Sequence, residues 1–447
     1  MNEAQGRLVG ALARVMARAG VCAPPSAPER LSGGANMESW RFSCGSDQFV
    51  LRRAPSADWL AARPLDLAGE AATIRAASAA GVRAPEIVAE LEPADEAGIG
   101  FVMRCIAGTA DPSVVLAEPP PSLIADIAQD LARIHAVDVA ALPFLPRLTP
   151  PEGVEALAAQ FAGFGGDRPL IALGLAWLRA NLPEAGDDSL VHGDLRIGNV
   201  MAENGRITGV LDWELAHAGD YHEDLAYGCM TVWRFGHLDK PAFGCADLDS
   251  YFAAYRAAGG RPVDPARFRF WLVYRTVWWA LGCLGMGGYW REGTDRSLER
   301  VVVARRAAEQ ELDLLRLLES DAPAAEHARA LPPPTPAAPS PSGEPTAAEI
   351  LTAVSEWLAA TVKPRLAGRD RFDLAVAQNA LGIVRRELAA RPAPADNALA
   401  ENLLAGRATL ATPGLLARLR RLALDTLSAD QPKYPALAEA RKAWDLA

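Results

Sequence analysis

The residues His192-Gly193-Asp194-Leu195-Arg196-Ile197-Gly198-Asn199 are the most informative stretch of this 447-residue chain. Asp212 follows Asn199 after thirteen residues, in the sequence Leu211-Asp212-Trp213-Glu214. A carboxylate, an amide five residues later and a second carboxylate therefore occur in a fixed order around a short polar turn. We expect the side chains of Asp194, Asn199 and Asp212 to meet in one place, and the other segments can be compared with that expectation.

The turn between Asn199 and Asp212 is Asn204-Gly205, a strong signal for a two-residue hairpin because both positions tolerate positive φ. It separates residues 200–203 from residues 206–211. Folding these two segments about the turn predicts two cross-strand pairs, Glu203 with Arg206 and Val200 with Gly209. Asn199 and Asp212 then lie at the open end of the hairpin, offset by about two residues, or roughly 7 Å along the strand.

The open end of this hairpin predicts a magnesium site. Mg²⁺ prefers oxygen ligands, keeps several waters and needs only one or two protein groups besides nucleotide phosphates. The pair of Asn199 and Asp212 suits that ion and would suit zinc poorly. Asp194 lies just upstream, on the loop that enters the hairpin. An ordinary turn followed by an ordinary hairpin is the alternative, but the order, the spacing and the turn chemistry together favour the metal site.

With these residues the segment resembles the aminoglycoside phosphotransferase and choline kinase family, a group related to protein kinases whose members phosphorylate small-molecule hydroxyls. Features similar to this family recur along most of residues 25–320. The resemblance implies an α+β, bilobal protein-kinase-like fold, with an N-lobe of antiparallel sheet plus helix and a mostly helical C-lobe. It also implies ATP and Mg²⁺ as cofactors.

The resemblance further implies roles for individual residues. Asp194 is similar to the catalytic carboxylate that orients the acceptor hydroxyl and takes its proton. Asn199 and Asp212 are similar to metal ligands, and His192 to a residue that supports the loop. Asp224 is similar to a residue that stabilises the catalytic loop without taking part in the chemistry itself. For Arg196 and Glu214 two roles stay open: each is either a residue of the site or a solvated surface charge.

A glycine-rich turn, Ser32-Gly33-Gly34, is expected between two strands near the N-terminus. Backbone N–H groups in such a turn can approach phosphates closely, because no bulky Cβ atoms intervene. Most turns of this kind are plain hairpins, so the turn gains weight only from the strand that follows. The resemblance implies that this turn binds the phosphates of the nucleotide.

The next strand carries the basic residue that would grip phosphates. Phe49-Val50-Leu51-Arg52 resembles the strand that holds a lysine in protein kinases, with arginine in its place. Strand alternation allows only one of Arg52 and Arg53 to point inward, and the sequence leaves open which one does. The partner carboxylate is expected to be Glu70, on a helix near residues 66–80. An exposed first-turn glutamate that favours the helix dipole is the alternative for Glu70.

The strand at residues 100–103 is expected to lead into the segment that joins the two lobes. By resemblance, the adenine would bond to the backbone of Arg104 and Ile106, with Met103 packing nearby. In the second lobe, residues 122–137 predict an amphipathic helix that ends near His135, for which core packing is the expected role. A tryptophan-rich region supplies either core aromatics or walls of an acceptor pocket: Trp233, Trp271, Trp278, Trp279 and Trp290.

The composition predicts a cytoplasmic protein. The formal net charge of −10 disfavours nucleic acid as a partner. Six cysteines show no C-x-x-C pair and are expected to be reduced. No apolar run reaches the roughly 18 residues of a membrane span, so no membrane association is expected.

The expected domains run along the chain in five segments. The last resembles a small helical domain of unknown function that accompanies this kinase group, and its expected use is homodimer formation or binding of a protein partner. Its helices are expected near 347–361, 371–390, 396–405, 414–428 and 435–445. The segments are an N-terminal helix at 1–24, an N-lobe at 25–106, a C-lobe with the catalytic loop at 107–320, a Pro/Ala-rich unpacked linker at 321–345 and a helical domain at 346–447.

The expected activity is that of an ATP:alcohol phosphotransferase, which moves the γ-phosphoryl group to a small-molecule hydroxyl. The sequence also resembles kinase-like domains that are attached to, or found beside, acyl-CoA dehydrogenases. That resemblance implies a hydroxyacyl-CoA or a related hydroxy acid as the acceptor. An aminoglycoside or choline-like acceptor is one alternative, and a catalytically inactive nucleotide-binding scaffold is another.

Overall fold

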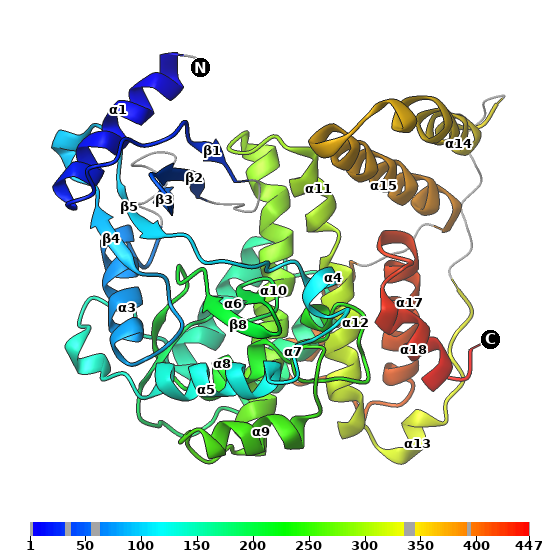
Figure 1. The fold of residues 1–447 in the computed structure, drawn as a ribbon. Coiled ribbons are helices and arrows are strands. Elements are labelled where there is room, and N and C mark those ends of the chain that lie inside the picture. The colour runs from blue at the N-terminus through cyan, green and yellow to red at the C-terminus, as the bar shows by residue number, and fades with distance from the viewer. Residues whose placement is uncertain (1–2, 32–36, 55–62, 335–344, 391–394, 447) are drawn as a thin grey trace. The chain divides into compact units, whose positions relative to one another are not determined.

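The computed structural model describes residues 3–31, 37–54, 63–334, 345–390 and 395–446 (Figure 1). These residues form two compact units. Unit 1 comprises Met1–Thr149 and Ala185–Phe268, and unit 2 comprises Pro150–Glu184 and Arg269–Ala447. This division differs from the predicted segments, because two parts of the expected C-lobe, Pro150–Glu184 and the residues from Arg269 onward, belong to unit 2 together with the C-terminal helices.

Unit 1 begins with helix α1 (Glu3–Arg18) and an antiparallel sheet of five strands in the order β1-β2-β3-β5-β4. All four pairings in this sheet are antiparallel, as the predicted N-lobe requires. The α+β class is therefore confirmed for this unit. The strands are β1 (Glu29–Arg30), β2 (Glu38–Cys44), β3 (Asp47–Arg53), β4 (Ile87–Glu90) and β5 (Gly100–Arg104).

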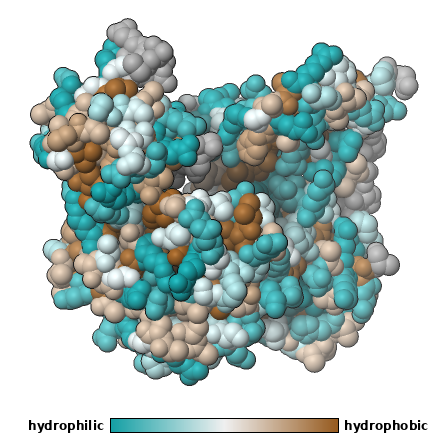
Figure 2. All heavy atoms as spheres, viewed as in Figure 1, coloured by the Kyte–Doolittle hydropathy of each residue, from teal (hydrophilic) through white to brown (hydrophobic). Residues whose placement is uncertain are grey.

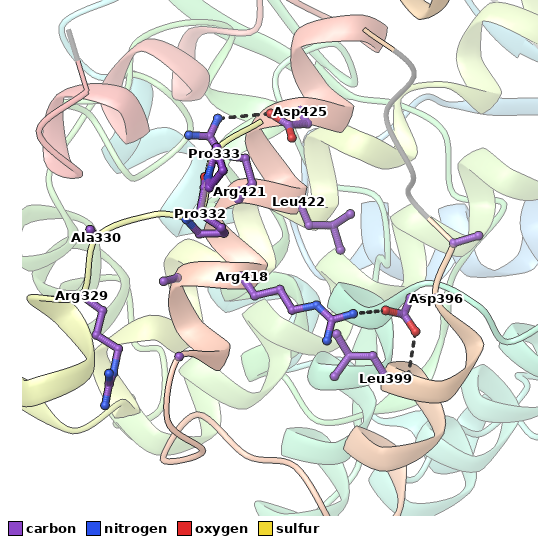
Figure 3. Close-up of a pocket in the computed structure, with 13 residues that line it drawn as sticks. Arg329, Ala330, Pro332, Pro333, Asp396, Leu399, Arg418, Arg421, Leu422 and Asp425 are labelled. Carbon is purple, nitrogen blue, oxygen red and sulfur yellow. Dashed lines mark hydrogen bonds and ion pairs between the residues drawn. The ribbon is translucent and has the colours of Figure 1, made fainter. Parts of the chain in front are cut away.

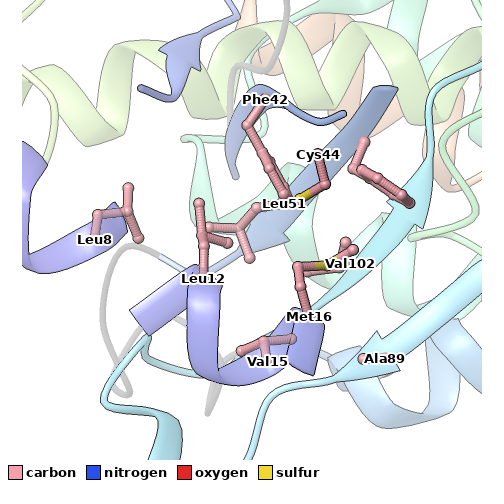
Figure 4. Close-up of a cluster of buried hydrophobic side chains, with 10 residues drawn as sticks. Leu8, Leu12, Val15, Met16, Phe42, Cys44, Leu51, Ala89 and Val102 are labelled. Carbon is pink, nitrogen blue, oxygen red and sulfur yellow. The ribbon is translucent and has the colours of Figure 1, made fainter. Parts of the chain in front are cut away.

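One face of this sheet packs against α1. Apolar residues recur along α1 at the spacing of one helix face, and they meet alternate residues of β2, β3 and β5 (Figure 4). The cluster contains Leu8, Leu12, Val15, Met16, Phe42, Cys44, Phe49, Leu51, Ala89 and Val102, all buried. Because side chains alternate along a strand, burying Phe49 and Leu51 on this face sends Val50 and Arg52 to the opposite face.

Helix α3 (Leu67–Ala79) supplies the acidic residue for that opposite face. Its first turn is capped by Asp66, whose Oδ1 accepts the Gly69 N–H at 2.7 Å. Glu70 lies in the same turn and is buried rather than exposed. The helix ends before Gly81, whose φ of +86° is the left-handed conformation that often follows a helix.

The rest of unit 1 is built from two short β-ribbons and several helices. Strand β6 (Ser189–Val191) pairs with β9 (His217–Gly219), and β7 (Val200–Glu203) pairs with β8 (Arg206–Val210). The 192–199 loop joins β6 to β7. The α-helices are α4 (Pro112–Val115), α5 (Leu123–His135), α8 (His222–Tyr227) and α9 (Leu248–Ala257).

The β7–β8 ribbon has the predicted turn but not the predicted register. Asn204 and Gly205 both have positive φ, and Glu203 faces Arg206 as expected. A bulge between Met201 and Ala202 then shifts the pairing, so the prediction that Val200 faces Gly209 is wrong: Val200 faces Val210. The cause lies outside the hairpin, since Ala202 exchanges two backbone hydrogen bonds with Thr109, at 2.9 and 3.0 Å.

The bulge changes the open end of the ribbon. Asn199 O accepts the Leu211 N–H at 2.8 Å, so Asn199 lies opposite the residue before Asp212. The offset between Asn199 and Asp212 is therefore one position, where an unshifted register would give two. Along the ribbon, the two residues are thus one position closer than the sequence alone predicts.

Unit 2 consists of helices joined by turns and contains no strand within its described residues. The expected C-terminal helices all occur, within a few residues of the predicted bounds, and the first of them continues into a π-turn at Leu358–Val362. The α-helices are α6 (Pro150–Gly163), α7 (Pro169–Ala180), most of α10 (Pro265–Glu292), α11 (Leu298–Ala304), α12 (Ala307–Leu318), α13 (Ala324–His327), α14 (Ala347–Trp357), α15 (Gly368–Ala390), α16 (Asn397–Leu404), α17 (Leu415–Asp430) and α18 (Pro435–Ala443).

Residues 321–334 differ from the unpacked linker expected there. They include α13, and Arg420 on α17 donates to His327 O at 3.2 Å and to Glu319 at 2.9 and 3.0 Å. Arg421 Nε donates to Pro332 O at 2.8 Å. A cavity of about 920 Å³ lies beside this segment (Figure 3). The arginines that line the cavity already form ion pairs with carboxylates, as Arg418 does with Asp396.

The face shown in Figure 2 carries apolar side chains between hydrophilic ones. The exposed large apolar side chains of the protein include several on α14 and α15, namely Ile350, Val354, Trp357, Phe372 and Val384. Among the described residues, no helix combines the length and the apolar character that a membrane span requires.

Candidate active site

The 192–199 loop places Asp194 and Asn199 in direct contact. Asn199 Nδ2 donates to Asp194 Oδ2 at 2.7 Å and to the Asp194 carbonyl at 2.8 Å. The other carboxylate oxygen, Oδ1, accepts from Arg196 Nε at 3.2 Å. Each carboxylate oxygen keeps a second lone pair, so Asp194 can still accept a hydrogen bond from a hydroxyl. The amide of Asn199 uses its nitrogen toward Asp194, which leaves its oxygen Oδ1 as a ligand.

His192 supports this loop through both ring nitrogens. Nδ1 accepts the Asp194 N–H at 3.1 Å, and Nε2 lies 3.1 Å from Leu211 O. These contacts assign the proton to Nε2 and the acceptor to Nδ1, which is the neutral form. Complete burial lowers the pKa of His192, in agreement with this assignment. Trp213 packs against the ring at a centroid distance of 4.6 Å.

Asp224 fixes the start of the 192–199 loop through two backbone N–H groups. Its Oδ2 accepts the His192 N–H at 2.7 Å, and its Oδ1 accepts the Gly193 N–H at 2.8 Å. His135 Nε2 lies 3.3 Å from the same carboxylate, and His135 Nδ1 lies 2.8 Å from the Tyr255 hydroxyl. Burial alone would raise the pKa of Asp224, but these hydrogen bonds lower it to about 2.

Replacing Asp224 with asparagine should destabilise the protein by about 3 kcal/mol, because an amide nitrogen would then face a backbone N–H that now has an acceptor. The pKa of the folded state is depressed, so the ionised carboxylate stabilises the fold at every pH above about 4. This contribution disappears only as the pH falls toward about 2. Denaturant unfolding of both proteins at neutral pH measures the difference; equal midpoints and slopes would show that Asp224 does not hold the loop.

Asp212 lies in a strained backbone conformation at the end of the β7–β8 ribbon. Its φ is +65°, which is uncommon for a residue other than glycine and costs roughly 1 kcal/mol or more. Strain of this kind persists where the surrounding structure fixes it, and it clusters at functional sites. The side chain of Asp212 is about one-third exposed. Asp212 and Asn199 line the same cavity, which has a volume of about 330 Å³.

Arg52 joins this cavity from β3, and Arg53 does not. Arg52 forms three ion pairs at 2.9 Å: Nε with Glu70, and Nη2 with both Asp212 and Glu214. Arg63 Nη2 forms another with Glu214 at 2.8 Å. Arg53 instead points to Glu38 and to the Ala97 carbonyl. We call Arg52, Arg63, Glu70, Asp212 and Glu214 the charged cluster.

The charged cluster has fewer cations than carboxylates, and this imbalance shifts its pKa values. Burial raises the pKa of Glu70 to about 7, and the neighbouring charges of Asp212 and Glu214 add to the rise against the effect of Arg52. Burial lowers the pKa of Arg52, but the three carboxylates outweigh burial and raise it. Arg52 therefore stays charged at every pH at which the protein is folded.

Glu70 should give the protein a distinctive pH dependence of stability. Its folded pKa, about 7, lies above its ordinary value of 4.5, so the folded state binds the extra proton between these values. Stability due to Glu70 is greatest below pH 4.5 and falls as the pH rises through about 7. The loss should reach on the order of 2–3 kcal/mol.

Glu70→Gln should remove this slope, because glutamine has the same shape and does not titrate. Unfolding free energies of the wild type and Glu70→Gln, measured from pH 5 to 8, provide the comparison. Glu86→Gln is a matched control, because Glu86 pairs with Arg104 on the exposed surface. Parallel pH profiles for wild type and Glu70→Gln would contradict the raised pKa.

The structure treats the other residues that were predicted to contact the nucleotide in three ways. Met103 and Ile106 line the cavity, as expected for an adenine site. Arg104 also lines it, and its N–H donates to Glu86 O at 2.9 Å within the sheet; the contact of its backbone with adenine stays a prediction. The contact of the Ile106 backbone stays a prediction as well. Ser32, Gly33 and Gly34 lie outside the described residues.

The donor set fits a magnesium ion better than a dedicated metal cage. Within the described residues no group of three His, Cys, Asp or Glu side chains can enclose a metal. One carboxylate, Asp212, and one amide oxygen, that of Asn199, border a cavity large enough for phosphates. This matches an ion that takes only one or two protein ligands and completes its shell with water and phosphate.

Sequence reasoning left several residues of the site open or missed them. The sequence left open whether Arg196 and Glu214 belong to the site or to the surface. Both belong to the site, because Arg196 pairs with Asp194 and Glu214 pairs with Arg52. Arg63 was missed, because nothing in its local sequence separates it from a surface arginine. His135 was expected only to pack in the core; its spacing carries no sign of the hydrogen bond to Asp224.

Two known families match parts of this chain. Residues 28–271, more than half of the chain, match the family described as "Phosphotransferase enzyme family". Residues 364–434 match a "Domain of unknown function (DUF6285)", which confirms the predicted resemblance of the C-terminal helices.

Curated relatives are longer proteins. The chain is 28% identical over 254 residues to "Acyl-CoA dehydrogenase family member 10" of Mus musculus, covering 51% of this chain and 23% of that protein. It is 29% identical over 240 residues to "Acyl-CoA dehydrogenase family member 11" of Gallus gallus, covering 47% of this chain and 31% of that protein. The chain thus spans less than a third of either relative.

A solved structure supports the fold. A "putative aminoglycoside phosphotransferase" from Ralstonia eutropha JMP134 superimposes with a TM-score of 0.56 at 24% identity, over 69% of this chain and 98% of that one. At this identity the match shows the fold alone. Together with the N-terminal antiparallel sheet, it confirms the predicted kinase-like architecture with an additional helical region.

Proposed function

Because this chain belongs to the phosphotransferase enzyme family, we propose that it transfers the γ-phosphoryl group of ATP to a hydroxyl of a small molecule. The observation that carries the proposal is the convergence of Asp194, Asn199, Asp212 and Arg52. Direct contacts link Asn199 to Asp194 and Arg52 to Asp212, and three of these residues line one cavity. A candidate catalytic carboxylate, two candidate metal ligands and a cation suited to bind phosphate therefore lie together.

Asp194 would orient the acceptor hydroxyl and receive its proton. Phosphoryl transfer has a loose transition state with little covalent chemistry for the protein, so positioning accounts for most of the rate. Asp194 suits this task because Asn199, Arg196 and the His192 ring fix its carboxylate and its backbone. Asp224 holds the same loop through two backbone N–H groups.

Arg52 would neutralise phosphate charge. Its ion pairs are shared among Glu70, Asp212 and Glu214, each at 2.9 Å. Glu70 fixes the direction of the guanidinium, and Nη2 is the nitrogen that can exchange a carboxylate for a phosphate oxygen. Asp212 and the Asn199 amide oxygen would hold Mg²⁺, which when bound supplies a counter-charge for the triphosphate.

The acceptor we propose is a hydroxy acid or a hydroxyacyl thioester. The support is the similarity to two relatives named as acyl-CoA dehydrogenases. A polycationic acceptor such as an aminoglycoside would require a cleft lined with unpaired carboxylates. In the described part of the site, the carboxylates of the charged cluster are instead paired with arginines.

The test is a panel of hydroxyl compounds incubated with ATP, with and without Mg²⁺, and examined by mass spectrometry. The panel contains hydroxy acids, hydroxyacyl-CoA thioesters, aminoglycosides and choline. We expect the mass of one phosphoryl group to be added to a hydroxy acid or its thioester, only when Mg²⁺ is present. No gain for any hydroxyl compound, despite ATP binding, would reject the proposed activity.

A further inference from the structure

Arg196 lies against Asp194 and keeps N–H donors that have no partner among the described residues. Its Nε donates to Asp194 Oδ1 at 3.2 Å. Its Nη1 reaches the Ile197 carbonyl at 3.4 Å, which is long for a hydrogen bond between nitrogen and oxygen. Among the described residues, Nη2 has no hydrogen-bond partner. Arg196 can therefore bind an additional oxygen ligand without giving up its contact with Asp194.

The guanidinium of Arg196 lies over the ring of Trp233. Its Cζ lies 4.4 Å from the centre of the Trp233 ring, a distance that gives a cation–π contact. Trp233 is buried and packs 6.0 Å from the Tyr227 ring. Arg234 fixes the same turn by donating to the Cys229 carbonyl at 2.8 and 3.0 Å. The N–H groups of a guanidinium lie in its plane and point outward from its edge, so a guanidinium whose position is fixed by a ring offers fixed directions to a planar anion.

Gly198 makes room for this arrangement. A Cβ built at Gly198 would lie 2.4 Å from Arg196 Nη1, and the backbone there has a φ of +114°. The loop thus has a glycine where any side chain would displace the guanidinium. The position of Arg196 is set by the loop itself and by Trp233, and its side chain is about one-quarter exposed.

Arg196 and Trp233 lie outside the cavity that we assign to the nucleotide. Gly198, Asn199 and Asp212 line that cavity, but Asp194, Arg196 and Trp233 do not. Gly198 borders both the cavity and the guanidinium, and Arg196 contacts the Asp194 carboxylate from outside the cavity. A hydroxyl held by Asp194 must approach from the side away from the nucleotide, since it attacks in line with the leaving oxygen.

We infer that Arg196, which lies over Trp233, binds an anionic group of the acceptor and so selects hydroxyl compounds that carry a carboxylate or a phosphate. This inference rests on the proposed function and narrows its acceptor class. With hydrogen bonds of ordinary length to Asp194 and to the guanidinium edge, the hydroxyl and the anion would lie within roughly 7 Å of each other. A cationic acceptor would meet like charge at the same place.

The test compares acceptors that differ only in charge. Hydroxybutyrates with the hydroxyl on the α, β or γ carbon are paired with their primary amides and with the corresponding amino alcohols, and glycerol phosphate represents the phosphate class. The readout is the ratio of kcat/KM for the acid to kcat/KM for its amide. We expect wild-type enzyme to prefer an anionic acceptor over its neutral partner by roughly 10- to 100-fold.

Variants then assign this preference to Arg196. Arg196→Met removes the charge and keeps the length, and it should lower the acid-to-amide ratio roughly 10- to 100-fold, chiefly through KM for the acid. Arg196→Lys should recover part of the ratio. Arg206→Met, on the exposed tip of the β7–β8 ribbon, is the control and should keep the wild-type ratio.

Two outcomes would overturn the inference while leaving the proposed function intact. One is transfer to hydroxyl compounds with no preference for an anion. The other is a loss in Arg196→Met that is equal for the acid and the amide, which would place Arg196 on the phosphoryl group or on Asp194 alone. Absence of transfer to every hydroxyl compound, thioesters included, would instead reject the phosphotransferase proposal itself.

Discussion

Replacing Asp194 with alanine should abolish phosphoryl transfer while ATP still binds. A positioned carboxylate that orients a hydroxyl and takes its proton contributes roughly 10²–10⁴-fold to the rate. The contacts among Arg52, Glu70 and Asp212 do not involve Asp194, and Asn199 would keep its hydrogen bond to the backbone carbonyl of residue 194 after its bond to the carboxylate is lost. The expected signature is therefore a fall in kcat with little change in the dissociation constant for ATP.

Single-turnover assays measure the transfer step for Asp194→Ala, and calorimetry measures ATP affinity. Asp187→Ala is a matched control, since Asp187 is an exposed aspartate a few residues before the loop. Asp194→Asn adds a second comparison: it keeps the size of the side chain and loses the charge. Turnover by Asp194→Ala at the wild-type rate would remove Asp194 from the catalytic role.

Asp212→Asn should remove the magnesium dependence of ATP binding. Asparagine keeps the size of the side chain and tolerates the positive φ of this position, so the fold should survive the change. The charged ligand is lost, and the expected loss in metal-dependent affinity exceeds the roughly 10- to 100-fold effect of removing an outer-shell partner. The loss should be absent when ATP is titrated without a divalent ion.

The measurement is ATP affinity for wild type and Asp212→Asn, each with Mg²⁺ and with a chelator. Glu203→Gln, at the exposed end of β7, is the control for removing a carboxylate from the same ribbon. Asp212 also pairs with Arg52, so the chelator arm separates metal binding from release of that arginine. Equal Mg²⁺ dependence in both proteins would exclude Asp212 as a ligand.

The sequence predicted the local features of the site well, because they depend on neighbouring residues. The Asn204-Gly205 turn follows from φ preferences. Strand alternation required that only one of Arg52 and Arg53 point inward but left open which one; the burial of Phe49 and Leu51 against α1 decides for Arg52. Glu70 was chosen by resemblance, and the structure places it 2.9 Å from Arg52.

Features that depend on distant segments were missed. The bulge in β7 arises from backbone bonds between Ala202 and Thr109, which no hairpin rule includes. Arg63 reaches the charged cluster through Glu214, and His135 reaches Asp224 from helix α5. Each of these contacts joins residues that only the tertiary fold brings together. The packed segment at 321–334 was also missed, since its partner arginines are on α17.

The most direct test of the account is a crystal structure with a non-hydrolysable ATP analogue and Mn²⁺ in place of Mg²⁺. We predict an anomalous manganese signal between the Asp212 carboxylate and the Asn199 amide oxygen, with the terminal phosphate facing Asp194. Nucleotide bound in the cavity with manganese away from both side chains, or with the terminal phosphate turned from Asp194, would contradict it.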